Sequence, residues 1–189
     1  YGPVIGTIPE QLQHARRPGD NGSDSHGSDV APLVAEGEFY WANTPAVQAL
    51  TGGPVDFSLV AVGGVRADLP AGEWREGDSA LTLLPFKNQL SVLTLTGAEV
   101  RALLTETITA TLPASGKFPY GGHLRYTFQE TDAGKAGTLT QLQRKTASGE
   151  WQDLVDSQRY RVVMNAYSAN GNDGWQALAN AQRHQSERV

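Results

Sequence analysis

The sequence contains no cysteine, and this absence excludes several kinds of chemistry. A chain without thiols has no disulfide, no thiolate nucleophile and no zinc site built on cysteine ligands. Exported and cytosolic proteins can both lack cysteine, so the compartment stays open. The chain starts at Tyr1 rather than Met, which favours a processed product or an excised piece of a longer protein.

Long apolar runs and an excess of positive charge are absent as well. No apolar stretch approaches the roughly 20 residues that a membrane-spanning helix needs. The formal net charge is -5, whereas nucleic acids and anionic membrane surfaces attract basic proteins. We therefore expect neither nucleic acid nor membrane as a main partner. Hydrophobic residues make up 39% of the 189 residues, which suits one globular domain with a sizeable core.

Histidine is scarce, and its four copies are isolated from one another. Around His26, the residues Asp20, Asp24 and Asp29 offer further metal ligands. A dinuclear site needs more ligands than these, so the favoured interpretation is a solvated loop that leads into a helix. The chain also has no G-x-S-x-G elbow after a strand, so a serine hydrolase of that type is not indicated.

Helical and strand patterns interleave, which predicts a layered α/β (α+β) domain with a mixed sheet flanked by helices. Residues 1–27 are predicted to be an irregular lead-in to a domain formed by residues 28–189. A first helix is expected to begin at Ser28 or Asp29, both good N-caps. The predicted strands are 55–62, 79–86, 89–96, 123–130, 137–145 and 159–167. Further helices are predicted at 44–50, 97–112 and 174–184, with a loop between 62 and 79.

Three stretches place ligand-binding groups beside predicted strand ends. The first is AVGGVRAD, where two glycines allow a close approach of the backbone and Arg66 follows. An arginine at this place can bind a phosphate or carboxylate through two parallel hydrogen bonds. Taken alone, such a string is more often a tight turn with a surface salt bridge.

The other two stretches are LLPFKN and NAYSANGNDGW. Phe86 and Tyr167 could stack on the two faces of a planar ligand, and each such face contributes about 1–3 kcal/mol. Asn88 presents an amide to a base edge, and Asp173 can accept hydrogen bonds from a sugar diol. The alternatives are packing of Phe86 at the core rim and a turn in which Asp173 caps a helix that starts at Trp175.

Taken in order, these pieces resemble the C-terminal domain of the 5′-nucleotidase / UDP-sugar hydrolase family. The likeness rests on VGGVRADLPAG, GDSALTLLPFKNQLSVLTLTGAEV, GKFPYGG and YRVVMNAYSANGNDG. It runs from about Arg16 to Trp175, and four ordered motifs are far more specific than any single one. The opening segment, RRPGD followed by SDVAPLVAE, is similar to bacterial members that act on NAD and nucleotides.

The resemblance implies a substrate-binding role for each matching residue. Phe86 and Tyr167 would clamp the nucleobase of a nucleotide such as AMP, NAD or a UDP-sugar. Asn88 would contact the base, and the backbone of Gly116 would line its pocket.

For the rest of the nucleotide, the resemblance implies that Asp173 holds the ribose and that Arg66 contacts the anionic part. One further arginine is expected from the lead-in, and both Arg16 and Arg17 would serve.

The same resemblance implies that catalysis resides elsewhere. Family members carry two divalent metal ions in an N-terminal metallophosphoesterase domain, and none of its motifs is present here. We expect no catalytic residue, no metal and no cofactor in this chain. The isolated domain is expected to be inactive, and its parent protein is expected to be periplasmic or on the cell surface. Ala61 and Val62 replace a family asparagine and glycine, so a structural domain that has lost ligand binding is an alternative. A self-contained metallohydrolase using Asp24 and His26 is a second alternative.

Overall fold

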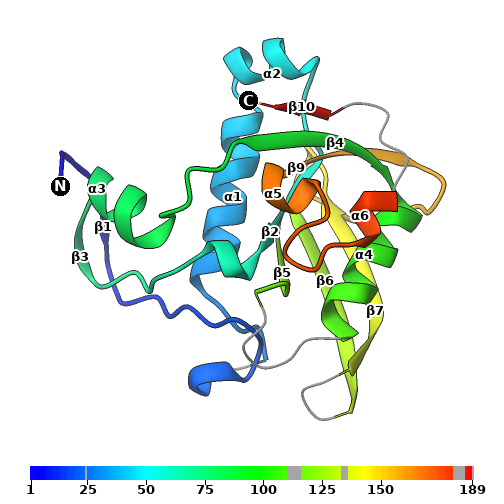
Figure 1. The fold of residues 1–189 in the computed structure, drawn as a ribbon, viewed down its shortest axis with the longest axis horizontal. Helices are drawn as coiled ribbons and strands as arrows, with labels where there is room; N and C mark the ends of the chain where they lie inside the picture. Colours follow the sequence, from blue (N-terminus) through cyan, green and yellow to red (C-terminus); the bar gives the residue numbers. More distant parts are fainter. Residues whose placement is uncertain (24, 110–115, 133–135, 181–185, 189) are drawn as a thin grey trace.

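The computed structural model describes residues 1–23, 25–109, 116–132, 136–180 and 186–188. Its central element is a mixed five-stranded sheet (Figure 1). In sheet order the strands are β10 (Ser186–Arg188), β4 (Leu90–Thr96), β9 (Arg159–Asn165), β2 (Phe57–Ala61) and β5 (Pro119–Gly122). The pair β2–β9 is parallel and the other neighbouring pairs are antiparallel, which confirms the predicted mixed sheet.

The two faces of this sheet belong to different parts of the core. Along β2, Phe57 and Leu59 pack in one cluster with α4 (Gly97–Thr109). Val60 packs in a second cluster with α1 (Val30–Ala42). Because successive side chains of a strand point to opposite faces, the two long helices cover opposite faces of the sheet. The sheet is therefore flanked by helices, as predicted.

Helix α1 begins where the sequence predicts a cap. The hydroxyl of Ser28 accepts hydrogen bonds from the backbone N–H groups of Val30 (3.2 Å) and Ala31 (3.0 Å). The backbone N–H of Ser28 donates to the hydroxyl of Tyr120 at 3.1 Å. Of the two predicted caps, Ser28 rather than Asp29 supplies the side-chain oxygen.

A second, antiparallel sheet packs against α4. Its strands are β6 (Leu124–Asp132), β7 (Ala136–Lys145) and β8 (Trp151–Asp153). The first two confirm the strands predicted at 123–130 and 137–145. Strands β5 and β8 were not predicted, because four and three residues are too few to show an alternating pattern.

The lead-in is not wholly irregular, so this prediction is wrong in part. Strand β1 (Val4–Ile8) pairs antiparallel with β3 (Gly72–Arg75), which lies in a stretch predicted to be loop. The two strands form a small separate sheet on the left of Figure 1. Most of β1 is exposed, and its pairing depends on backbone hydrogen bonds rather than on the buried alternating pattern that marks a strand in sequence.

The predicted strand at 79–86 is also wrong. Residues 76–83 form two consecutive helical turns, α3 (Glu76–Asp78) and η3 (Ser79–Leu83). The carboxylate of Asp78 accepts a hydrogen bond from the backbone N–H of Arg75 at 2.9 Å, which starts the helical segment as a capping box does. Local polar bonding thus overrides the apolar run that suggested a strand.

Strand β10 was not predicted, whereas the other elements agree with the sequence to within a few residues at their ends. The predicted strand 159–167 ends at Asn165, where α5 (Ala166–Ala169) begins. Helix α2 (Pro45–Thr51) confirms the helix predicted at 44–50. The closing helix is α6 (Ala177–Asn180), and residues 110–112 and 181–184 of the predicted helices lie outside the described residues. Within the described ranges, every helix is too short or too polar to cross a bilayer.

Candidate functional site

Two of the predicted ligand-binding loops start from the same edge of the central sheet. In the antiparallel pair β4–β9, Leu90 at the start of β4 lies opposite Asn165 at the end of β9. One residue further, the backbone N–H of Ala166 donates to the carbonyl of Gln89 at 2.7 Å. The loop 84–89 and the loop 166–174 are therefore neighbours, although about 80 residues separate them in sequence.

Both predicted stacking rings are half exposed at this edge. Phe86 is 54% exposed and Tyr167 is 50% exposed, and neither belongs to a core cluster. Asn165 accepts a hydrogen bond from the backbone N–H of Tyr167 at 2.7 Å and so fixes the turn that carries the ring. Asn88 is exposed beside Phe86. The alternative of Phe86 as a rim residue packed into the core does not fit this exposure.

Arg66 lies next to the Phe86 loop. Its backbone N–H donates to the carbonyl of Leu83 at 2.9 Å, which ties the loop after β2 to η3. The guanidinium carbon is 5.9 Å from the centre of the Phe86 ring, within the range of a cation–π contact. Arg66 itself is exposed, so a positive charge stands beside an exposed aromatic ring.

Gly116 joins the same region through backbone contacts. The N–H of Gly63 donates to the carbonyl of Gly116 at 2.8 Å. A Cβ atom on Gly63 would lie 2.9 Å from the Gly116 Cα, so both positions need glycine for this close approach. On the other side, the indole N–H of Trp175 donates to the carbonyl of Lys117 at 2.8 Å. The segment 116–117 therefore links the loop after β2 with the loop after β9.

Asp173 occupies a left-handed backbone conformation with φ of 59°. Its carboxylate accepts a hydrogen bond from the hydroxyl of Ser168 at 3.1 Å. Partial burial raises the pKa of Asp173, and the Ser168 hydrogen bond opposes this shift. An acidic side chain is thus held in a fixed orientation within the loop.

The alternative role of Asp173 as a helix cap is wrong. Helix α6 begins at Ala177 rather than at Trp175. The backbone N–H of Ala177 donates to the carboxylate of Glu106 on α4 at 2.9 Å. Since another acid satisfies the start of this helix, capping does not account for Asp173.

The two lead-in arginines lie in different surroundings. Arg17 is buried, donates to Glu130 at 3.1 Å, and lies 5.7 Å and 5.9 Å from the ring centres of Phe118 and Phe128. Arg16 is half-buried. The sequence alone did not distinguish these two residues, because they are adjacent.

His14 joins the lead-in to the loop that carries Arg66. Its pKa is lowered, mainly by burial, with smaller contributions from the positive charges of Arg16 and Arg66 and an opposing one from Asp68. The backbone N–H of His14 donates to Asp68 at 2.7 Å, and its Nδ1 lies 3.0 Å from the Ser28 hydroxyl.

The acidic loop around His26 does not form a metal site among the residues that can be described. No group of three or more His, Cys, Asp or Glu side chains in those ranges is arranged to hold a metal ion. His26 instead pairs with Asp29 at 3.1 Å. Asp24, the other residue considered as a ligand, lies outside the described residues.

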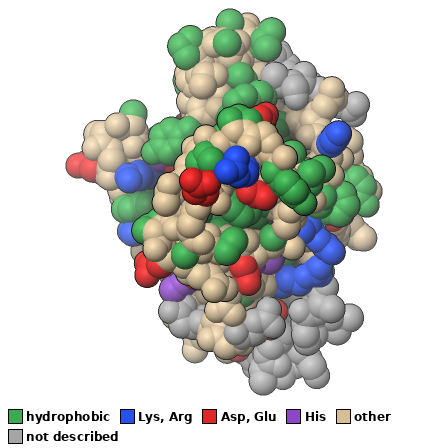
Figure 2. Space-filling view, turned by 90° about the vertical axis from the view of Figure 1, so that its left-hand side faces the viewer, with side chains coloured by type: hydrophobic (Ala, Val, Ile, Leu, Met, Phe, Trp, Pro, Cys, Tyr) green, Lys and Arg blue, Asp and Glu red, His purple; other side chains and the backbone are tan. Residues whose placement is uncertain are grey.

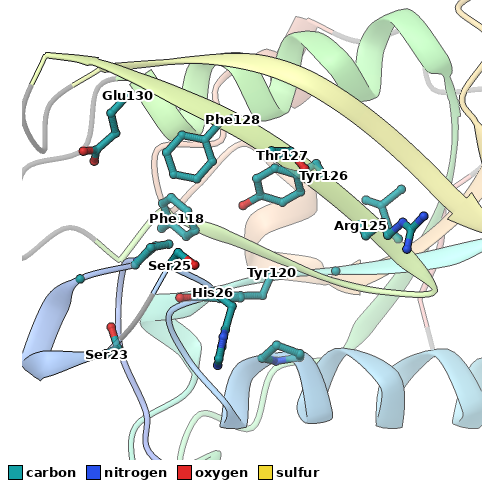
Figure 3. A pocket seen from close by; sticks show the side chains of 15 residues that line it. Ser23, Ser25, His26, Phe118, Tyr120, Arg125, Tyr126, Thr127, Phe128 and Glu130 are labelled. Carbon is teal, nitrogen blue, oxygen red and sulfur yellow. The ribbon is translucent and has the colours of Figure 1, made fainter.

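The sequence did not predict a cavity of about 890 Å³ between the lead-in and strands β5 and β6 (Figure 3). The rings of Phe118, Tyr126 and Phe128 gather on one wall, and Ser25 and His26 lie on the facing loop (Figure 3). None of the predicted nucleotide-binding residues lines this cavity. Its aromatic residues alternate along β5 and β6, but no sequence signal indicated that the lead-in would face them.

Residues 4–180 match the family described as 5′-nucleotidase, C-terminal domain. The chain belongs to this family.

Its relatives are much longer proteins. NAD 5′-nucleotidase of Haemophilus influenzae is 32% identical over 166 residues, which cover 86% of this chain and 26% of that protein. A cell wall protein of Listeria monocytogenes is 29% identical over 174 residues, covering 87% of this chain and 20% of that protein. The chain thus spans about a quarter of the length of these curated relatives.

Solved structures of the family share the fold. The 5′-nucleotidase precursor from Thermus thermophilus superposes with a TM-score of 0.77 at 28% identity, over 98% of this chain and 33% of that one. The layered mixed sheet is therefore the architecture of this 5′-nucleotidase domain, as the sequence predicts.

Proposed function

We propose that this chain binds the nucleobase and ribose of a nucleotide, as the substrate-binding part of a 5′-nucleotidase-like hydrolase. The observation that carries the proposal is the convergence of four loops at one edge of the sheet in a member of this family. Arg66 lies against Phe86, Gly116 contacts the Arg66 loop, and Asp173 lies in the loop beside Gly116 and Lys117. Exposed aromatic rings, an exposed arginine and a partly buried acid are thus carried by neighbouring loops.

In this proposal Phe86 and Tyr167 stack on the two faces of the base. Half-exposed rings at neighbouring loops suit this role, because the area that they leave in water is available to a planar ligand. Asn88, exposed beside Phe86, supplies donors and acceptors for the base edge.

Asp173 and the arginines serve the sugar and the anionic group. The carboxylate of Asp173 accepts hydrogen bonds from the ribose hydroxyls while Ser168 keeps it oriented. Arg66 provides the positive charge for the phosphate side, and we assign the second arginine to Arg16, because Arg16 is half-buried whereas Arg17 is buried. Arg17 is engaged with Glu130 in another cluster.

We assign the hydrolytic step to a separate metal-binding domain of a longer parent. The described residues do not fit a dinuclear metal centre, since they contain no cluster of three potential ligands. This chain therefore contributes binding and orientation of the nucleotide, and we derive no bond-breaking step from its side chains.

We propose an extracellular or cell-surface location for the parent protein. The support is the named cell wall protein of Listeria monocytogenes among the relatives. The NAD 5′-nucleotidase of Haemophilus influenzae supports AMP and NAD as the first ligands to test.

Isothermal titration calorimetry of the chain with adenosine tests the binding proposal. Phe86→Ala and Tyr167→Ala should each weaken binding about 5- to 150-fold, since stacking contributes roughly 1–3 kcal/mol per face. Tyr1→Ala is the matched control, because it removes a ring that is 79% exposed outside the site. Binding that persists in both loop variants would contradict the clamp, and no binding by the folded wild type would favour the structural-domain alternative.

A phosphate-release assay tests the alternative that this chain is itself a hydrolase. With AMP or NAD and a divalent metal, we expect no turnover by this chain. Turnover that is lost on His26→Ala would instead identify a self-contained metallohydrolase.

A further inference from the structure

A groove runs along α1 on the side away from α4, and we call it the α1 groove. Its volume is about 350 Å³. One wall is a single face of α1, with residues spaced three or four apart, and the other wall is made of leucines. The lining residues are Val30, Leu33, Val34, Gly37, Glu38, Trp41, Leu69, Leu83, Leu84 and Leu90.

The α1 groove exposes apolar side chains that a surface helix normally buries. Leu33 is 51% exposed, Trp41 is 41% exposed and Leu84 is 38% exposed. Single exposed leucines are ordinary, but these three side chains line one groove. Hydrophobic side chains also reach the surface on the side of the molecule that carries β1, β3 and α3, between clusters of charged residues (Figure 2).

Gly37 stands in the middle of the helical wall. Glycine disfavours a helix interior relative to alanine. A Cβ atom on Gly37 would have nothing within 4 Å, and its φ is not in the left-handed region. Nothing in the described part of this chain therefore requires glycine at this position, whereas a partner that approaches α1 closely would require it.

Glu38 is the polar group of the groove. Its Oε2 atom is buried and has no hydrogen-bond partner among the described residues. Burial raises the pKa of Glu38 to about 8. By contrast, Glu36 on the same helix accepts two hydrogen bonds from His123, both at 2.7 Å. A buried carboxyl oxygen without a partner is unfavourable, and Glu38 is the one ionisable side chain among the described residues that line the groove.

We propose that the α1 groove is a docking site for a polypeptide segment that inserts apolar side chains and places one lysine or arginine beside Glu38. The apolar walls match the inserted side chains, Gly37 gives the segment close access to α1, and the basic group satisfies the carboxyl. An elongated groove lined at helical spacing from Val30 to Trp41 suits a polypeptide better than a compact ligand.

This docking site is distinct from the proposed nucleotide site. None of the residues assigned to the nucleotide lines the groove, although Leu84 and Leu90 flank the loop that carries Phe86. Docking can therefore be tested without nucleotide, and its failure would leave the nucleotide proposal unaffected.

The probe is a fluorescently labelled, 14-residue amphipathic peptide with leucines at positions i, i+3 and i+7 and one central lysine. Matched peptides carry glutamine or glutamate in place of the lysine. Fluorescence anisotropy with the 189-residue chain should show at least tenfold tighter binding of the lysine peptide than of the glutamate peptide. Glu38→Gln should remove most of this difference, since it removes the acceptor charge.

Leu33→Ser and Leu50→Ser form a matched pair of variants. Both leucines are exposed, at 51% and 67%, but Leu50 lies on α2 outside the groove. We expect Leu33→Ser to weaken the lysine peptide at least tenfold and Leu50→Ser to leave it within twofold, with unchanged circular dichroism for both. Equal affinity for all peptides, or unchanged binding in both Leu33→Ser and Glu38→Gln, would overturn the proposal. A dimer in sedimentation that Leu33→Ser dissolves would also overturn it, by assigning the groove to a second copy of the chain.

Discussion

Two arginine–aromatic clusters in this molecule contain similar residues, but one arginine is buried and the other is exposed. Arg17 is 4% exposed, pairs with Glu130, and lies near two phenylalanine rings that belong to the core and its edge. Arg66 is exposed and lies beside Phe86, which is itself 54% exposed.

The difference teaches that residue type alone does not indicate function. In the Arg17 cluster, the guanidinium and the Phe118 ring are buried and the Phe128 ring is half-buried, so the cluster stabilises the fold. In the Arg66 cluster, the charge and the ring face solvent, so they are available to an anionic, planar ligand.

Replacing the two arginines tests this difference and carries the largest expected effect. Arg17→Met should lower the free energy of unfolding by about 2–3 kcal/mol, because a buried cation–π contact and a charged hydrogen bond are lost. Arg66→Met should change it by less than about 0.5 kcal/mol, as a surface substitution does. Urea unfolding followed by circular dichroism measures both.

The same two variants should show the opposite order in ligand binding. Arg66→Met should weaken AMP about tenfold more than adenosine, since only AMP carries the phosphate that we propose the arginine contacts. If Arg66→Met unfolded the protein as readily as Arg17→Met, the distinction between the two clusters would be lost.

The sequence predicted the exposed cluster better than the buried one. Phe86 follows a proline, and Arg66 comes shortly after two glycines, so both carry local signals that short motifs can show. The pairing of Arg17 with Glu130 joins residues 113 positions apart. Such a contact depends on how the lead-in lies across β6, which no local pattern encodes.

The arrangement of the loops is a second feature that local sequence patterns do not predict. The β-branched and apolar runs of β4 and β9 predicted both strands, but the register that sets Leu90 opposite Asn165 came only from the structure. The helical turn 76–83 was missed, because one side chain, Asp78, decides it through a hydrogen bond to Arg75. Helix α1 is continuous although it contains Gly37, a residue type that disfavours a helix interior.

Substitutions at two neighbouring glycines, Gly63 and Gly64, test the same site with a smaller expected effect. Gly63→Ala should lower stability by about 1–2 kcal/mol and also weaken adenosine, because its Cβ would lie 2.9 Å from Gly116. Gly64→Ala is the control, since a Cβ there has nothing within 4 Å. Parallel thermal unfolding and titration of both variants measure the effect, and identical behaviour would remove Gly116 from the site.

Substitutions of two acids, Asp173 and Glu130, provide the next test. Asp173→Asn should weaken adenosine about tenfold and 2′,3′-dideoxyadenosine hardly at all, because only adenosine has the ribose diol. Glu130→Gln should leave both affinities unchanged and lower stability by less than about 1 kcal/mol, as its side chain is 47% exposed. A loss of affinity that is equal for the two nucleosides would argue against a ribose contact.

The smallest expected effect is the pH dependence that Asp173 adds to stability. Burial raises its pKa in the folded state above the unfolded value, so the folded protein holds the proton more tightly. The stabilising contribution is therefore complete below the unfolded pKa and is lost as pH rises through the folded pKa. Relative to wild type, Asp173→Asn should gain stability as pH rises from below the unfolded pKa of about 4 towards neutral in urea titrations. A constant difference between the two proteins over this range would contradict the shift.

The most direct test of the central claim is a set of nuclear Overhauser effects between bound adenosine and the aromatic side chains of the chain. The account predicts contacts from the adenine H2 and H8 protons to the rings of both Phe86 and Tyr167, and contacts from ribose protons to the loop around Asp173. Contacts to Phe118, Tyr126 or Phe128 of the large cavity, with none to Phe86 and Tyr167, would contradict it.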